Sequence, residues 1–310
     1  MSDTPSEPSR CPCRRKAIII PLIIIVIGGL ATGAWLKQDA WVPPPVTNWN
    51  ADQLARIHAP AGDTLRFAVY ADNRERNYFS LGKPFNAVLN EIAARQDLAF
   101  IMHDGDAITH GHKLEFYRIF QAWRSHPQAA PMLMTVGNHE LRKGRDANYI
   151  SMFGPTHYAF RVGRHAFISM NTASQAAFND DEVAWLRDQL AAAQDAETRV
   201  VFMHIPLGDV SKTQISILAD PRIHGDTRVR TVIDLFKQYK VTLAIASHFH
   251  GWYEGDWDGT PFVVTGGAGV TLEQDPDDRT RPDPVHSFYH YLIVDLHDGK
   301  ASVEVVRPKL

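Results

Sequence analysis

The chain repeats one pattern at five places: a short apolar run stops abruptly, and residues with metal-binding side chains follow at once. The clearest example is residues 131–136, an apolar run that leads directly into Gly137, Asn138, His139 and Glu140. The other runs end in Asp72, Asp106, His204 and His248-Phe249-His250. Such a run predicts a buried strand that delivers polar groups onto a tight turn. Because sites in open α/β sheets are built at the carboxyl ends of strands, we expect these side chains to meet.

Helical periodicity alternates with the apolar runs. Apolar residues recur at helical spacing in residues 84–95, 114–123, 181–192 and 231–239. Strands are expected at residues 65–71, 98–102, 131–136, 200–203 and 241–246, and later at 262–269, 288–296 and 301–306. This alternation predicts an α/β protein with largely parallel central strands, and the later strands indicate a second, mixed sheet.

The order and wording of the five motifs resemble the calcineurin-like metallophosphoesterases, which include the purple acid phosphatases. That family reads Asp-x-His, Gly-Asp, Gly-Asn-His-Asp/Glu, His and Gly-His-x-His in chain order. The resemblance begins near Leu65 and extends to the C-terminus. It implies a two-sheet αββα sandwich, in which mixed β-sheets are flanked by helices.

The resemblance also implies a site for two metal ions. Asp106 would bridge the ions, Asn138, His204 and His248 would complete one of them, and Asp72 and His250 would bind the other. A hydroxide that bridges the ions would attack phosphorus, and His139 would stabilise the transition state or protonate the leaving oxygen. Nitrogen and oxygen donors suit divalent or trivalent Mn, Fe or Zn.

Each motif alone has a plainer explanation. A Gly-Asp pair such as Gly105-Asp106 is usually a turn or a helix cap, and Asn138 is a common turn former. His204 alone fits a strand-end histidine bonded to the backbone. It is their joint occurrence in one order that predicts a metal site.

The first motif departs from the family pattern. Where Asp-x-His is expected, the chain reads Asp72-Asn73-Arg74, and the tyrosine of purple acid phosphatases is replaced by Thr109. Asn73 and His110 are candidates to complete the first metal site. Arg74 is a candidate catalytic residue that holds a phosphate oxygen of the substrate, although pairing with a neighbouring carboxylate explains it equally well.

The N-terminus predicts a membrane anchor. Residues 1–16 form a polar tail that ends in three basic residues, and residues 17–36 carry no charge and are long enough to cross a bilayer. Basic residues on the N-terminal side favour a single-pass protein of the cell (inner) membrane, with the catalytic domain on the periplasmic or extracytoplasmic side. The alternative is a signal peptide cut near residues 31–34. Residues 37–60, with three consecutive prolines, predict an extended tether, and residues 61–310 the catalytic domain.

The composition limits the classes of partner and the kinds of metal ligand that are expected. The net charge is −3, so nucleic acid is not expected. The two cysteines, Cys11 and Cys13, precede the apolar segment, which leaves nitrogen and oxygen donors for the metals. The sequence thus predicts a metal-dependent hydrolase of phosphate mono- or diesters, acting on a small-molecule or lipid-linked substrate. Two alternatives stay open: a non-catalytic or single-metal module that binds a phosphoryl ligand, and a mononuclear hydrolase of different bond specificity.

Overall fold

The computed structural model describes residues 38–40, 42–74, 81–211, 215–219, 225–274 and 283–310. The chain divides into two units, residues 1–43 and 44–310. In the first unit, Gln38–Ala40 forms a 3-10 helix, η1. The predicted basic tail and membrane segment, residues 1–36, lie outside the described residues. Among the helices that are described, none has both the length and the apolarity needed to cross a bilayer.

The described part of residues 44–310 contains two mixed β-sheets. The first has the strand order β11-β10-β1-β2-β3 and the second the order β4-β5-β6-β7-β9-β8. The first sheet comprises β1 (Leu65–Tyr70), β2 (Phe100–His103), β3 (Met132–Met134), β10 (Tyr291–His297) and β11 (Lys300–Val306). The second comprises β4 (Tyr158–Val162), β5 (His165–Ser169), β6 (Thr198–Phe202), β7 (Leu243–Ala246), β8 (Trp252–Trp257) and β9 (Thr260–Thr265).

Parallel strands form the part of each sheet from which the site is built. β1, β2 and β3 pair in parallel, with Val69 opposite Met102 and His103 opposite Met134. β5, β6, β7 and β9 also pair in parallel, whereas β4, β8, β10 and β11 pair in antiparallel fashion. The parallel strands of each sheet therefore end at one edge, where the motifs are expected to meet.

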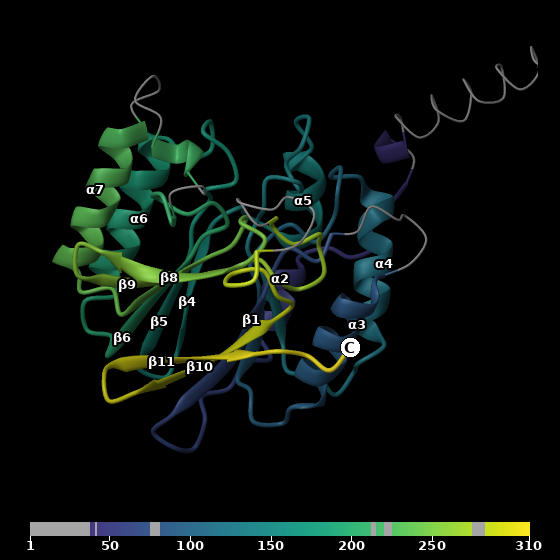
Figure 1. Ribbon diagram of the computed structural model, residues 1–310, viewed down its shortest axis with the longest axis horizontal. Coiled ribbons are helices and arrows are strands. Elements are labelled where there is room, and N and C mark those ends of the chain that lie inside the picture. Colours follow the sequence, from purple (N-terminus) through teal and green to yellow (C-terminus); the bar gives the residue numbers. More distant parts are fainter. Residues whose placement is uncertain (1–37, 41, 75–80, 212–214, 220–224, 275–282) are drawn as a thin grey trace, which may run out of the picture. The chain divides into compact units, whose positions relative to one another are not determined.

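Alternating side chains divide the core into layers. In β1, Phe67 and Val69 pack between the two sheets, and Ala68 and Tyr70 face the helices. Five helices in the described part cover the outer faces: α3 (Lys83–Ala94), α4 (Lys113–Arg124) and α5 (Asp146–Phe153) on the first sheet, and α6 (Asp180–Ala192) and α7 (Gly225–Gln238) on the second. Figure 1 shows α6 and α7 beside one sheet and α3 and α4 on the opposite side. The predicted α/β sandwich of two mixed sheets is confirmed for the described residues.

One segment differs from its prediction as a tether. Residues Trp49–Leu54 form helix α2, which packs along the edge strand β3. The Asn50 amide donates to Met134 O and accepts from Met134 N, both at 3.0 Å. Gln53 Oε1 accepts from Met132 N at 3.2 Å. These amides pair the edge of β3 as a further strand would, so this part of residues 37–60 belongs to the domain.

Candidate metal centre

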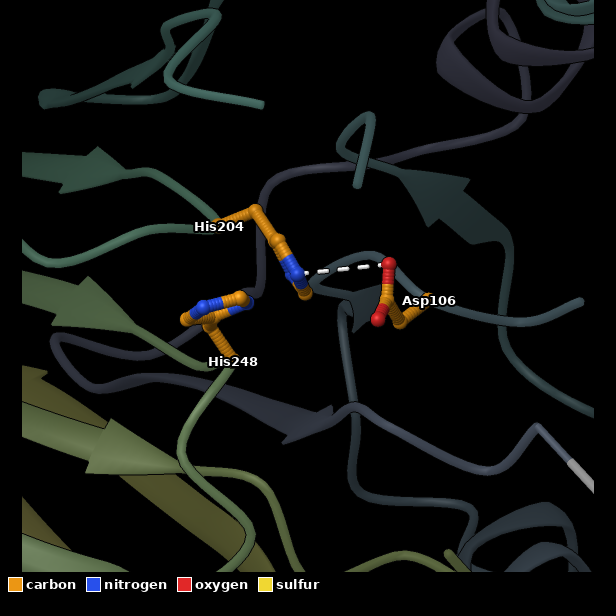
Figure 2. A group of neighbouring side chains, drawn as sticks. All are labelled: Asp106, His204 and His248. Carbon is orange, nitrogen blue, oxygen red and sulfur yellow. Dashed lines mark ion pairs between the residues drawn. The ribbon is translucent and has the colours of Figure 1, made fainter. Parts of the chain in front are cut away.

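Strand ends from both sheets bring the predicted ligands together. Asp72, Asp106 and Asn138 follow β1, β2 and β3, whereas His204 and His248 follow β6 and β7. One ligand atom each of Asp106, His204 and His248 lies within 4.8 Å of the others. Figure 2 shows these three side chains converging, with His204 directed at the Asp106 carboxylate. The expectation that the motifs meet at one edge therefore holds for this group.

Asn138 adds a fourth donor at the centre of this group. Its Oδ1 lies 3.0 Å from Nε2 of His204 and 3.1 Å from Nδ1 of His248, and Asp106 Oδ1 lies 3.3 Å from the same His204 nitrogen. His204 Nδ1 lies 3.0 Å from the carbonyl of Asp104 and donates to it, because a carbonyl can only accept. When His204 is neutral, the lone pair of its Nε2 therefore faces the other donors. A set of converging nitrogen and oxygen lone pairs fits one Mn, Fe or Zn ion.

The charges in this group are strongly coupled. Burial alone would raise the pKa of Asp106, but the charges of His204, His139 and Arg74 hold it well below its ordinary value. Burial opposes protonation of His204, yet Asp106 and Asp72 raise its pKa to about 10. Burial, reinforced by His204, lowers the pKa of His248 to about 3. The two carboxylates thus favour a positive charge at His204, and burial opposes one at His248.

The other half of the predicted site contains the guanidinium of Arg74. Its Nε donates to Asp106 Oδ2 at 3.0 Å, and its Nη2 lies 3.1 Å from Nε2 of His250. His250 Nδ1 donates to the carbonyl of Thr271 at 2.8 Å, so its Nε2 accepts from the guanidinium. Asp72 Oδ1, 3.7 Å from His250 Nε2, is buried and finds no hydrogen-bond partner among the described residues. Asp72 and His250 therefore lie close to each other, and the Arg74 guanidinium contacts His250.

His139 lies at the rim of the site. Its backbone N–H donates to Asp106 Oδ1 at 3.0 Å, and its Nδ1 donates to the carbonyl of Thr109 at 2.6 Å. Its Nε2 lies 3.8 Å from Asp106 Oδ2, and 12% of the side chain is exposed. Burial lowers the pKa of this imidazole, and Asp106 opposes that effect. His139 thus presents one ring nitrogen toward the carboxylate without being part of the converging donor group.

Glu140 holds together the two turns that carry Asp106 and Asn138. Its buried carboxylate accepts the backbone N–H groups of Gly137 at 2.8 Å and of Asp106 and Ala107 at 2.9 Å. Burial, followed by the charge of Asp106, raises its pKa to about 8. Sequence reasoning did not assign Glu140 a role, although it is the last residue of the Gly-Asn-His-Glu motif. The positions of Asp106 and Asn138 depend on this carboxylate.

The backbone of the site is strained and tightly packed. Asp72, Asp106 and His248 have φ values of 57°, 59° and 74°, in the left-handed region that non-glycine residues avoid. A Cβ at Gly137 would lie 2.5 Å from Asp106 Oδ1, so only glycine fits there. Left-handed residues cost roughly 1–3 kcal/mol each and cluster at functional sites. Three of the predicted ligands, Asp72, Asp106 and His248, are therefore held by a strained backbone.

The two candidates to complete the first metal site contact other side chains. His110, a candidate for the first metal site, is directed at α4, where its Nδ1 lies 3.2 Å from Glu115 Oε1. Asn73, the other candidate, has its Oδ1 in contact with Nε2 of His103.

A cleft of about 480 Å³ opens beside the metal-binding group. Asn138 and His248 form part of its wall, so the converging donors border on it. Ala173, Ile205 and Ile217 supply an apolar side. The same cleft is lined by Arg142, an exposed cation. A molecule in this cleft would contact Asn138 and His248 as well as apolar side chains.

Comparisons with known proteins agree with this geometry. A family model described as calcineurin-like phosphoesterase matches residues 65–252. Among solved structures, the chain resembles the purple acid phosphatase PPD1 from yellow lupin (Lupinus luteus) seeds, with a TM-score of 0.63 and 16% identity over 81% of this chain and 52% of that one. It also resembles GAP50, the anchor in the inner membrane complex of Plasmodium, with a TM-score of 0.55 and 14% identity over 79% of this chain and 85% of that one.

These structural similarities concern the fold. The chain spans about half the length of the lupin protein, and the identities of 16% and 14% are low. A search of curated proteins found no match.

Proposed function

Because the chain belongs to the calcineurin-like phosphoesterase family, we propose that it hydrolyses phosphate monoesters or diesters with the help of metal bound at Asp106, Asn138, His204 and His248. The observation that carries this proposal is the convergence of one ligand atom each from Asp106, His204 and His248 within 4.8 Å, with the Asn138 amide oxygen between the two imidazoles. Donors of this kind from two different sheets have no need to meet in a purely structural protein. A bound metal ion would polarise the phosphoryl group and activate water.

The residues around the metal site have separate tasks. Glu140 fixes the turns that carry Asp106 and Asn138 through backbone hydrogen bonds. Arg74 supplies a permanent positive charge next to Asp106, and about a fifth of its side chain is exposed, so it can also contact a phosphate oxygen. The cleft beside Asn138 and His248 would receive the organic part of the substrate.

His139 is the proposed general acid. Since its Nδ1 donates to Thr109, the neutral ring can only accept a proton at Nε2, whereas the imidazolium can donate one there. Burial lowers its pKa, and the negative charge of a bound phosphate would favour the imidazolium. Protonation of the leaving oxygen is therefore a role that depends on substrate binding.

We also propose that the protein acts at the cell membrane, with its catalytic domain on the extracytoplasmic side. This proposal rests on the sequence of residues 1–36, which contains a basic tail and an uncharged apolar segment. A lipid-linked or small-molecule phosphoester would then be the substrate. Membrane fractionation and protease accessibility of the domain in intact cells test it, because a cytosolic, protease-protected domain contradicts it.

The alternative function is a module that binds one metal ion or a phosphorylated ligand without turnover. The contacts of Arg74 with Asp106 and His250 favour this alternative, because they alter the first half of the site. GAP50, which has a similar fold, is described as an anchor. The two functions differ in turnover, which can be measured directly.

The test compares the full-length chain with Asp106→Asn, using Mn²⁺ and chromogenic phosphate mono- and diesters. We expect the variant to lose most of its metal and nearly all of its activity, because Asp106 is the only carboxylate in the converging group found among the described residues. Asp188→Asn, an exposed position on α6, is the matched control. Full turnover by Asp106→Asn contradicts the assignment, and metal binding without turnover by the wild type supports the binding module.

A further inference from the structure

The guanidinium of Arg74 has the position and the contacts of a bound cation. We propose that it permanently replaces one of the two metal ions that the motifs predict, so that each chain binds a single metal ion at Asp106, Asn138, His204 and His248. This inference rests on the proposed function, because it concerns the same site, but it makes a separate prediction about metal content.

Arg74 uses the lone pairs that a second ion would need. A metal ion in this half would bind Asp72, Asp106 and His250. Arg74 Nε donates to Asp106 Oδ2 at 3.0 Å, and Nη2 lies 3.1 Å from the lone pair of His250 Nε2. An ion bonded at about 2.0–2.2 Å to these two atoms would need the same lone pairs and would lie too close to the guanidinium nitrogens. The two cations therefore exclude each other.

Backbone hydrogen bonds hold Arg74 beside Asp106. The backbone N–H of Arg74 donates to Asp106 O at 3.2 Å, and that of Asp72 donates to Gly105 O at 3.1 Å. These bonds fix the turn that carries Arg74 against the turn that carries Asp106. About a fifth of the Arg74 side chain is exposed, whereas Asp72 and Asp106 are fully buried. Arg74 is thus part of the site and not a surface arginine.

Arg74 also contributes to the balance of charge in the site. Asp72 and Asp106 place two carboxylates in a buried site, where unpaired charges are costly. A guanidinium is protonated at every physiological pH, so it supplies one positive charge without depending on metal supply. One divalent ion added to Arg74 exceeds the charge of the two carboxylates. The site with one metal ion therefore still attracts a phosphate anion.

The other side chains that a second metal ion would need are still present beside Arg74. Asp72 Oδ1 is buried and has no hydrogen-bond partner among the described residues, although it lies 3.7 Å from His250 Nε2. If Arg74 is replaced by histidine, Asp72, Asp106 and His250 can all serve a second ion together with the new imidazole. The chain thus retains Asp72, Asp106 and His250 as ligands for a second ion, and the Arg74 side chain alone prevents that ion from binding.

The experiment measures manganese in the full-length chain by elemental analysis and by electron paramagnetic resonance. We expect about one Mn²⁺ per wild-type chain, with the spectrum of an isolated ion, and about two per chain in Arg74→His, with a spin-coupled spectrum. Arg187→His, an exposed position on α6, adds a histidine elsewhere and should leave the wild-type value unchanged. None of these measurements depends on turnover.

Each outcome decides the inference. Two tightly bound ions in the wild type, with spin coupling, overturn it, as does a wild type that binds none. If Arg74→His does not fold, the wild-type spectrum alone decides between one ion and two. A wild type with one ion and no phosphoesterase activity supports this inference and contradicts the proposed function, whereas an active wild type with two ions does the reverse.

Discussion

At the scale of the residue, a proton competes with the metal ion. The carboxylates of Asp106 and Asp72 outweigh burial and raise the pKa of His204 to about 10, so this imidazole is charged at neutral pH when no metal is bound. His248 has a pKa lowered to about 3 by burial and is neutral there. Asp106 is already ionised, because its pKa is lowered. Binding of a metal ion at His204 Nε2 must therefore displace one proton.

We expect metal binding at pH 7 to release about one proton per ion, and the apparent affinity to rise about tenfold per pH unit until His204 deprotonates by itself. The sign follows from the raised pKa, because the competing proton is lost as the pH rises toward 10. Calorimetry in two buffers of different ionisation enthalpy counts the released protons. Binding that is independent of pH between 6 and 8 would show that His204 is not a ligand.

A substitution at His139 should affect catalysis without affecting metal binding. Its side chain donates to Thr109 and stands 3.8 Å from Asp106, outside the converging donors. We expect His139→Ala to lower kcat by about 10²–10⁴-fold, the usual contribution of a general acid, while the metal content stays unchanged. The backbone N–H that supports Asp106 is retained in this variant. Steady-state kinetics and metal analysis on one preparation test this, and unchanged kcat would remove His139 from the mechanism.

At the scale of the element, prediction succeeds where burial is continuous. The apolar runs predicted β1, β2, β6 and β7 to within two residues, because buried parallel strands have almost uninterrupted apolar sequences. Helix α2 was not predicted, because its six residues are too few to show a period and it buries the amides of Asn50 and Gln53. Helix α5 and strand β8 were missed as well, and β8 exposes three consecutive residues. Short elements that depend on tertiary contacts leave little local signal.

Helix α2 pairs with the edge of β3, the strand that leads to Asn138. Loss of this pairing should therefore destabilise the folded domain. Asn50→Ala leaves the buried N–H of Met134 without its acceptor, and we expect the free energy of unfolding to fall by about 1–3 kcal/mol. Asp52→Ala, on the exposed side of α2, should change it by less than about 0.5 kcal/mol. Chemical denaturation of both variants measures the difference. Equal effects would mean that the amide pairing with β3 adds nothing.

At the scale of the whole molecule, the site joins two sheets. The sequence predicted that the side chains of Asp106, His204 and His248 meet, because the motifs follow strands and strand ends gather at one edge. It did not predict that Arg74 would turn inward onto Asp106 and His250, since pairing at the surface satisfied the sequence equally well. It also did not assign Glu140, because a buried acceptor of backbone N–H groups is recognisable only once two distant turns are adjacent. Convergence follows from topology, whereas the direction of individual side chains depends on packing.

Because Asp106 and Asn138 come from the first sheet and His204 and His248 from the second, a bound metal ion should hold the two sheets together. At a free metal concentration of 100 times Kd, binding stabilises the folded state by about 2.7 kcal/mol. For a domain of this size we expect a chelator to lower Tm by about 5–10 °C. Asp106→Asn should show the lower Tm with or without chelator, whereas Asp188→Asn should behave as the wild type. Differential scanning calorimetry at fixed pH measures the shift, and a wild-type Tm that does not respond to chelator would mean that no ion links the two sheets.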